Sequence, residues 1–231
     1  YAARNKKNQS EIKYFEINLK EPKKTLSAIE DSIIPLGDIG GFDHAGVMPS
    51  SILRPFKDKN EVWLYYTGWS RRLDVPYHNS IGLAISHDNG KTFKKYSQGP
   101  LISSSVIDPY FVGTPCVIKD GDLFRCWYYS SIGWFKEDDT LEPRYHLKYA
   151  ESKDGINWAR NGLVCIDFKS EEEGAICSPT VIIENGKYKM WFSYRGTLNY
   201  RNDKAHSYKI GKAESKDGLV WHRCDEKAEI E

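Results

Sequence analysis

Three stretches of the sequence are variants of one pattern: G-V-M-P-S-S-I-L at residues 46–53, V-G-T-P-C-V-I at 112–118 and I-C-S-P-T-V-I-I at 176–183. Their prolines, Pro49, Pro115 and Pro179, follow one another at steps of 66 and 64 residues. A fixed period of this length is typical of repeat architectures, in which each copy forms one structural unit. The 231-residue chain is therefore expected to contain three related units.

Each copy is predicted to form four short strands. In the first copy these are 49–53, 62–67, 80–86 and 93–96, which are rich in Val, Ile, Tyr, Phe and Trp and bounded by turn-forming residues. No window repeats apolar residues at helical spacing, so helix is expected to be nearly absent. Four strands per repeat predict an all-β chain with the fold of a β-propeller. A series of packed sandwiches fits less well, because one copy is too small to bury its own core.

A turn of one pattern connects the third and fourth strands of each copy. It reads S-H-D-N-G-K-T-F at 86–93, S-K-D-G-I-N-W at 152–158 and S-K-D-G-L-V-W at 215–221. In such turns Asp accepts backbone N–H groups and Gly supplies a positive φ. We interpret these turns as structural hairpins rather than as binding sites.

The chain is expected to be a single propeller domain, 1–231, that begins inside a blade. The expected units are a half blade and linker at 1–36 and complete blades at 37–100, 101–165 and 166–231, with residues 11–19 as a third strand of the half blade. Closed propellers usually have at least four blades, and closure removes exposed sheet edges. About three and a half blades therefore indicate part of a longer, five-bladed propeller, whose open edges could also pair in a homo-oligomer.

Composition narrows the classes of partner. With 33 basic and 32 acidic residues, the charge favours neither nucleic acid nor an anionic membrane, and no apolar run of 18 residues predicts a membrane span. Five cysteines without a C-x-x-C pair favour a reduced, cytoplasmic protein, with a Cys116–Cys126 disulfide as the alternative. The histidines lack short metal-ligand spacing and there is no phosphate or dinucleotide fingerprint, so no metal and no cofactor is expected.

Each copy also carries an acidic residue six or seven positions before its proline: Asp43, Asp108 and Glu173. Residues just before the innermost strands of a propeller project into its axial funnel, so these carboxylates are expected to converge. Converging carboxylates push one another's pKa values apart, which leaves one as a base and another as a protonated acid. Cleavage of a glycosidic bond requires such a pair.

The order Asp, Asp, Glu resembles the five-bladed propeller glycosidases of glycoside hydrolase family 43 and their relatives in families 32, 68 and 130. The likeness is closer to uncharacterised bacterial proteins of this superfamily, through G-V-M-P-S at 46–50, P-Y-F-V-G-T-P-C-V at 109–117 and R-Y-H-L-K-Y-A-E-S at 144–152. The resemblance implies Asp43 as the general base or nucleophile, Asp108 as the residue that tunes the acid and Glu173 as the general acid. The sequence departs from family 43 in that Asp43 precedes His44 rather than proline. Glu171 and Glu172 are alternatives to Glu173 for the role of general acid.

Long loops after the second strands combine aromatic residues, arginine and histidine, and loops on a rigid scaffold often carry specificity. Two tryptophans could stack on sugar rings, and the arginines could hold a phosphate, a carboxylate or a nucleotide-sugar diphosphate. The predicted substrate-binding residues are His44, Trp69, Arg71, His78, Trp134, Arg144, His146, Arg195 and Arg201.

The sequence therefore predicts a carbohydrate-active propeller that cleaves glycosidic bonds by acid–base chemistry in an axial funnel, with a carbohydrate or sugar phosphate as its ligand. One alternative is a phosphate-dependent phosphorylase or glycosyl-transferring enzyme of the family 130 kind, in which arginine and histidine hold phosphate. Another is a sugar-binding propeller without catalysis.

Overall fold

A computed structural model describes residues 1–29, 31–137 and 139–228. The expected units at 1–36, 101–165 and 166–231 each include a few positions outside this described part: 30, 138 and 229–231. The strands of the first blade are β5 (Gly46–Leu53), β6 (Val62–Ser70), β7 (His78–Ser86) and β8 (Lys94–Lys95). Those of the second are β9 (Val112–Asp120), β10 (Leu123–Glu137), β11 (Thr140–Ser152) and β12 (Val164–Ile166). Those of the third are β13 (Glu173–Glu184), β14 (Lys187–Gly196), β15 (Lys209–Ser215) and β16 (His222–Arg223).

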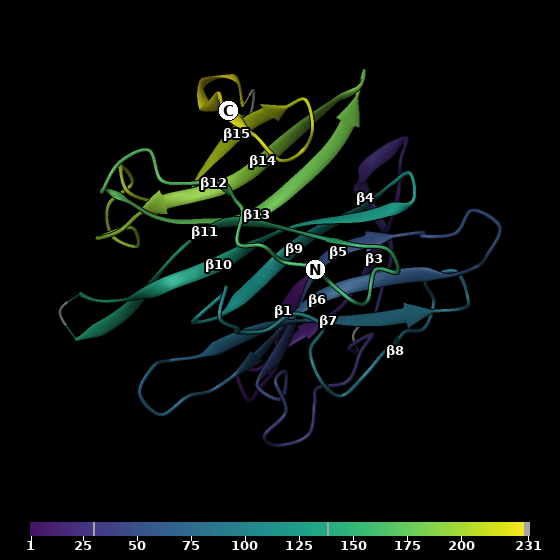
Figure 1. The fold of residues 1–231 in the computed structure, drawn as a ribbon. Helices are drawn as coiled ribbons and strands as arrows, with labels where there is room; N and C mark the ends of the chain where they lie inside the picture. The colour runs from purple at the N-terminus through teal and green to yellow at the C-terminus, as the bar shows by residue number, and fades with distance from the viewer. Residues whose placement is uncertain (30, 138, 229–231) are drawn as a thin grey trace.

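Each blade is an antiparallel sheet of consecutive strands. The order is β5-β6-β7-β8 in the first blade, β9-β10-β11 with β12 on β11 in the second, and β13-β14-β15-β16 in the third. Figure 1 shows the three blades following one another through the molecule. The described part of the chain contains a single short 3₁₀ helix, η1 (Asp225–Lys227). The predictions of an all-β propeller and of nearly absent helix are confirmed.

The N-terminal segment differs from its prediction. Strands β1 (Ala2–Arg4) and β2 (Ser10–Ile12) pair with each other, and β2 joins the first blade through one parallel pair, Ser10 with Gly46. The strand expected at 11–19 ends at Ile12, because the chain leaves the sheet and forms a separate hairpin of β3 (Phe15–Asn18) and β4 (Glu21–Ala28). The side chains of this hairpin are exposed along both strands.

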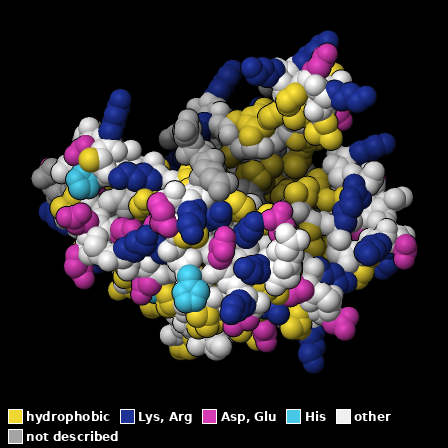
Figure 2. All heavy atoms as spheres, turned by 90° about the horizontal axis from the view of Figure 1, so that it is seen from above, with side chains coloured by type: hydrophobic (Ala, Val, Ile, Leu, Met, Phe, Trp, Pro, Cys, Tyr) yellow, Lys and Arg dark blue, Asp and Glu magenta, His cyan; other side chains and the backbone are white. Residues whose placement is uncertain are grey.

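Three clusters of apolar side chains hold neighbouring units together. One packs Ile12 and Ile34 against β5, β6 and β7, the second lies between the first and second blades, and the third lies between the second and third blades. The core is therefore formed between sheets, because a single sheet cannot cover its own faces. Figure 2 shows a hollow in the face seen from above, with hydrophobic side chains in its floor and charged side chains around its rim.

The first strands of the second and third blades are also tied to the preceding blade by hydroxyl groups. The backbone N–H of Thr114 donates to Oγ1 of Thr67 at 2.9 Å, and the N–H of Ser178 donates to Oγ1 of Thr114 at 3.0 Å. Thr114 and Ser178 have φ values of 38° and 52°, a conformation that is uncommon for residues other than glycine. This bend turns their N–H groups toward the preceding blade.

The repeated turns connect blades as well as strands. The Ser152 hydroxyl donates to Asp154 and accepts from the N–H of Gly155, while Asp154 accepts two further backbone N–H groups. The turns at Ser86 and Ser215 repeat these contacts. The carbonyl of Gly155 accepts a hydrogen bond from Tyr65 of the first blade at 2.8 Å, and that of Gly218 accepts one from Trp127 of the second blade at 2.9 Å.

The five cysteines are all free thiols, and Cys116 and Cys126 are buried. The alternative disulfide between these two is therefore not formed. Burial raises the pKa of the Cys116 thiol to about 11, so it is protonated at neutral pH and behaves as a small apolar side chain. The described part of the chain contains no helix with the length and apolar character of a membrane span.

Candidate functional site

The three predicted catalytic carboxylates lie in three matching ion pairs. Lys95 Nζ lies 2.6 Å from Asp43 Oδ2, and Arg160 Nη1 lies 2.7 Å from Asp108 Oδ2. Arg223 holds Glu173 with two nitrogens, at 2.7 and 2.9 Å. Each cation belongs to the outer part of the same blade as its acid.

Asp108 has the most enclosed of these environments. It is 0% exposed and also lies 3.3 Å from Lys148 Nζ. Tyr128 donates its hydroxyl to the same carboxylate at 3.1 Å, as Tyr66 does to Asp43 at 2.8 Å. Buried charges are stable only when they are paired and hydrogen-bonded, and these contacts meet that requirement.

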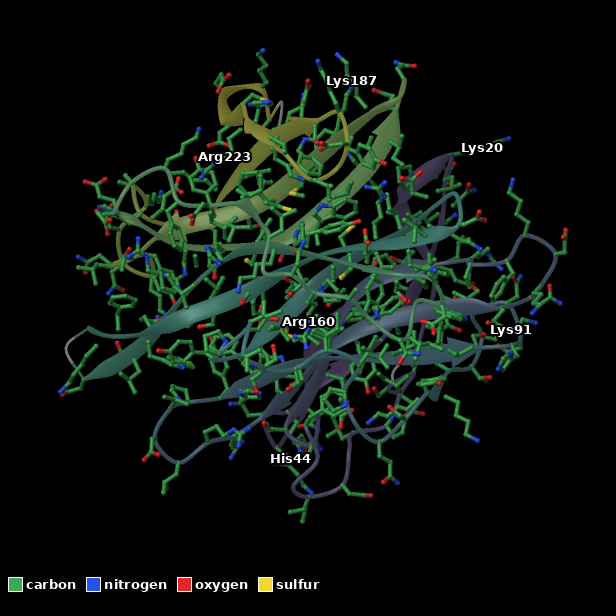
Figure 3. The ribbon with its side chains drawn as sticks, viewed as in Figure 1. Lys20, His44, Lys91, Arg160, Lys187 and Arg223 are labelled. Carbon is green, nitrogen blue, oxygen red and sulfur yellow. The ribbon has the colours of Figure 1, made fainter. Side chains whose placement is uncertain are left out.

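The cations of these pairs were missed in the sequence, although a signal for them exists. Lys95, Arg160 and Arg223 each stand two positions after the aromatic residue that closes the repeated turn, in F-K-K, W-A-R and W-H-R. Figure 3 shows Arg160 near the middle of the molecule and Arg223 in the third blade, whereas His44, beside Asp43, lies at the opposite end. These contacts favour a structural role for the carboxylates, and their catalytic roles stay predictions.

A different set of side chains meets where the first and second blades adjoin. Tyr77 lies at the centre of an aromatic cluster, with ring centroids 4.6 Å from Trp69, 5.1 Å from Trp134 and 5.5 Å from Phe111. Phe111 and Trp134 are themselves 5.4 Å apart. The two tryptophans that were predicted to stack on sugar are therefore brought together through a tyrosine from the same loop as Arg71.

Beside this cluster lies a groove with a volume of about 610 Å³, which we call the Trp134 groove. Its lining includes Arg72, Asp74, Tyr77, His78, Tyr110, Phe111 and Trp134. Of the predicted binding residues, His78 and Trp134 line it directly. Arg72 lines it in place of the predicted Arg71.

Residues of the third blade reach this region by contacting Glu142, a buried carboxylate of β11 in the second blade. Tyr200 donates its hydroxyl to Glu142 at 2.7 Å, Arg201 forms an ion pair with it, and Arg195 lies 3.8 Å away. The Arg195 guanidinium stacks on the Tyr200 ring at 3.7 Å. Burial raises the pKa of Tyr77, and Arg195 and Glu142 are among the charges that act on its hydroxyl. Side chains of all three blades therefore meet around Tyr77.

Two predicted binding residues have structural contacts elsewhere. His44 Nδ1 lies 2.8 Å from the carbonyl of Gly41, within its own turn. Arg144 donates to the carbonyl of Glu173 at 3.2 Å, lies 3.4 Å from Glu171 and stacks on Phe168. Neither residue is part of the lining of the Trp134 groove.

The predicted binding residue His146 is 8% exposed, and its Nδ1 lies 3.1 Å from Asp167. Burial lowers its pKa, and Asp167 opposes that effect. Burial and the nearby Arg72 likewise lower the pKa of His78. A histidine with a lowered pKa is predominantly neutral in the folded protein near pH 6.5.

These two histidines predict a loss of stability in acid. As the pH falls below about 6.5, the unfolded chain binds protons that the folded chain does not, so the free energy of unfolding decreases. The His146→Asn variant is expected to show a shallower decrease between about pH 6.5 and 5, measured by urea unfolding at each pH. An unchanged slope in both His146→Asn and His78→Asn would contradict this assignment.

Solved structures with the same architecture include glycoside hydrolases. One has a TM-score of 0.66 at 18% identity and covers 92% of this chain and 59% of its own length. A BT0996 RGII complex has a TM-score of 0.65 at 15% identity, covering 93% and 64%. A thermostable family-43 glycoside hydrolase has a TM-score of 0.52 at 20% identity, covering 78% and 52%. The chain thus has the β-propeller fold of these glycoside hydrolases and spans about 60% of the length of the first two.

Closer relatives exist in sequence. Two uncharacterised Mycobacterium tuberculosis proteins, MT1551 and Rv1502 from two strains, are each 34% identical over 223 residues, which cover 96% of this chain and 70% of the relative. The chain belongs to the same protein family as these two proteins. No model of a known protein family matches the chain.

Proposed function

We propose that this chain is the carbohydrate-binding part of a glycosidase-like protein and that the saccharide lies in the Trp134 groove. The observation that carries this proposal is the convergence of Tyr77, Phe111 and Trp134 on one open groove that also contains charged and hydrogen-bonding side chains. Flat aromatic rings bind the apolar faces of sugars, while polar side chains fix their orientation. The propeller fold shared with glycoside hydrolases supports the same class of ligand.

The chemistry of the proposed enzyme requires two carboxylates. The sequence assigns them to Asp43 and Glu173, with Asp108 tuning the acid, and this assignment is part of the proposal. The groove itself contributes Asp74, and the buried Glu142 lies beside Tyr77. Turnover of nitrophenyl glycosides by Asp43→Asn, Glu173→Gln, Asp74→Asn and Glu142→Gln variants would distinguish the two sets.

A second candidate is a sugar-binding propeller without catalysis. It is favoured by the ion pairs that neutralise Asp43, Asp108 and Glu173. A screen of nitrophenyl glycosides and glycosyl phosphates, with and without inorganic phosphate, separates the candidates. Turnover without phosphate supports a hydrolase, phosphate-dependent turnover supports a phosphorylase, and saturable binding without turnover supports the sugar-binding protein.

Trp134 provides the direct test of the site. The Trp134→Ala variant is expected to bind a saccharide about tenfold more weakly, because it loses a stacking contact of about 1.5 kcal/mol. Trp134→Phe, which keeps an aromatic ring, is the matched control and should retain most of the affinity. Titration calorimetry measures both variants, and equal affinity of Trp134→Ala and the unchanged protein would remove the groove from the site.

A further inference from the structure

The arginines of this region differ in whether their guanidinium already forms an ion pair with a carboxylate. Arg144 lies 3.4 Å from Glu171, while Arg195 and Arg201 both lie beside Glu142. Arg72 is exposed in the groove and has no ion pair among the residues that the structure describes. Its guanidinium is therefore available to a ligand.

Five ionic groups of this region, Arg72, Asp74, Arg195, Arg201 and Glu142, sum to one positive charge. Arg72 and Asp74 cancel each other, whereas Arg195 and Arg201 face the single carboxylate of Glu142. The group of Arg195, Arg201 and Glu142 therefore carries one net positive charge, and Arg195 and Glu142 are among the charges that act on the Tyr77 hydroxyl. The groove combines this field with a guanidinium, an imidazole (His78) and an aromatic platform. A guanidinium matches the geometry of carboxylate and phosphate groups, with which it forms strong hydrogen bonds.

We propose that the Trp134 groove binds an anionic saccharide, in which Trp134 stacks on the sugar ring and Arg72 binds a carboxylate or phosphate substituent. This inference rests on the proposed function and adds the class of saccharide. Asp74, which lines the groove near this substituent, repels it and accepts hydrogen bonds from sugar hydroxyls. Arg72 and Asp74 therefore act on anionic ligands with opposite signs.

The test uses matched sugars and the 231-residue chain. Ligand-observed NMR would compare galactose with galacturonic acid and galactose 6-phosphate, and repeat the comparison in the gluco and manno series. The anionic members are expected to bind at least about tenfold more tightly than their neutral counterparts, because hydrogen bonds to charged groups are the strong ones. The uronic acid and phosphate arms identify which substituent is bound.

Variants assign the preference to the groove. Arg72→Met should weaken binding of the anionic sugar at least about tenfold and leave the affinity for the neutral sugar unchanged. Asp74→Asn should raise the affinity for the anionic sugar about two- to fivefold. Arg54→Met is the control, because Arg54 is an exposed arginine outside the groove lining, and it should change neither affinity.

The outcomes separate this inference from the proposed function. Equal binding of neutral and anionic sugars, weakened alike by Trp134→Ala, would overturn the inference and leave the proposed function standing. An anionic preference that Arg72→Met does not reduce would also overturn it. Absence of binding by every sugar in all three series would overturn both.

Discussion

The Asp108→Asn variant is expected to lose about 3–5 kcal/mol of its free energy of unfolding. Asp108 is 0% exposed, and its carboxylate contacts Arg160 at 2.7 Å and Lys148 at 3.3 Å. An amide preserves the size of the side chain and one hydrogen bond but leaves two largely buried cations without a counter-charge. Removing one member of a buried ion pair is costly because the other charge stays in a poorly solvating environment.

Thermal and urea unfolding measure this loss, which corresponds to a decrease in Tm of about 6–20 °C for a chain of this size. Adding Arg160→Met to Asp108→Asn should recover part of the loss, since it removes one uncompensated cation. Glu184→Gln, in the exposed pair of Glu184 with Lys189, is the control and should have little effect. If Asp108→Asn kept its Tm and lost only turnover, the catalytic role predicted from the sequence would be supported instead.

The Gly155→Ala variant is expected to lose about 2–5 kcal/mol. Gly155 has a φ of +73°, and a methyl group there would lie 2.7 Å from the Trp63 ring and 2.8 Å from the Tyr65 hydroxyl. Alanine therefore adds an unfavourable backbone conformation and an overlap with two buried aromatic side chains. The overlap also disturbs the hydrogen bond from Tyr65 to the Gly155 carbonyl.

Gly90 is the matched control, because it occupies the equivalent turn of the first blade. Its φ is +93°, but the nearest atom to an added methyl group is 3.8 Å away. Gly90→Ala should cost only the backbone term of about 1–2 kcal/mol. Urea unfolding of both variants measures the difference, and equal losses would show that packing between blades does not depend on this turn.

The fold was largely predictable from the sequence because its cause is a repeated local pattern. Each copy places strand-forming residues and turn residues in the same order. The hairpins therefore fall at corresponding positions after Pro49, Pro115 and Pro179. The N-terminal hairpin β3–β4 was not predicted, because Phe15 and Ile17 alternate with polar residues as they would in a sheet strand. The unit bounds at 36, 100 and 165 stay predictions.

The candidate site was predictable only in part. Trp134 and His78 were singled out because they stand in predicted long loops rich in aromatic residues, arginine and histidine, and both line the Trp134 groove. Asp43, Asp108 and Glu173 were assigned to a shared funnel because they recur at the spacing of the repeat. The sequence does not show the cations with which they form ion pairs. Lys95, Arg160 and Arg223 come from segments about 50 positions later, and contacts over such a separation are set by how the sheet folds back on itself.

The hydrogen bonds from Tyr65 to Gly155 and from Trp127 to Gly218 have a consequence for how the molecule unfolds. The first and second blades each donate from their second strand to a turn that exists only once the following blade has formed. If one blade unfolded alone, a buried polar group of its neighbour would lose its hydrogen-bond partner, at a cost of about 1–3 kcal/mol. The blades are therefore linked in one cooperative transition, and slow hydrogen exchange should extend with similar protection from β6 through β14.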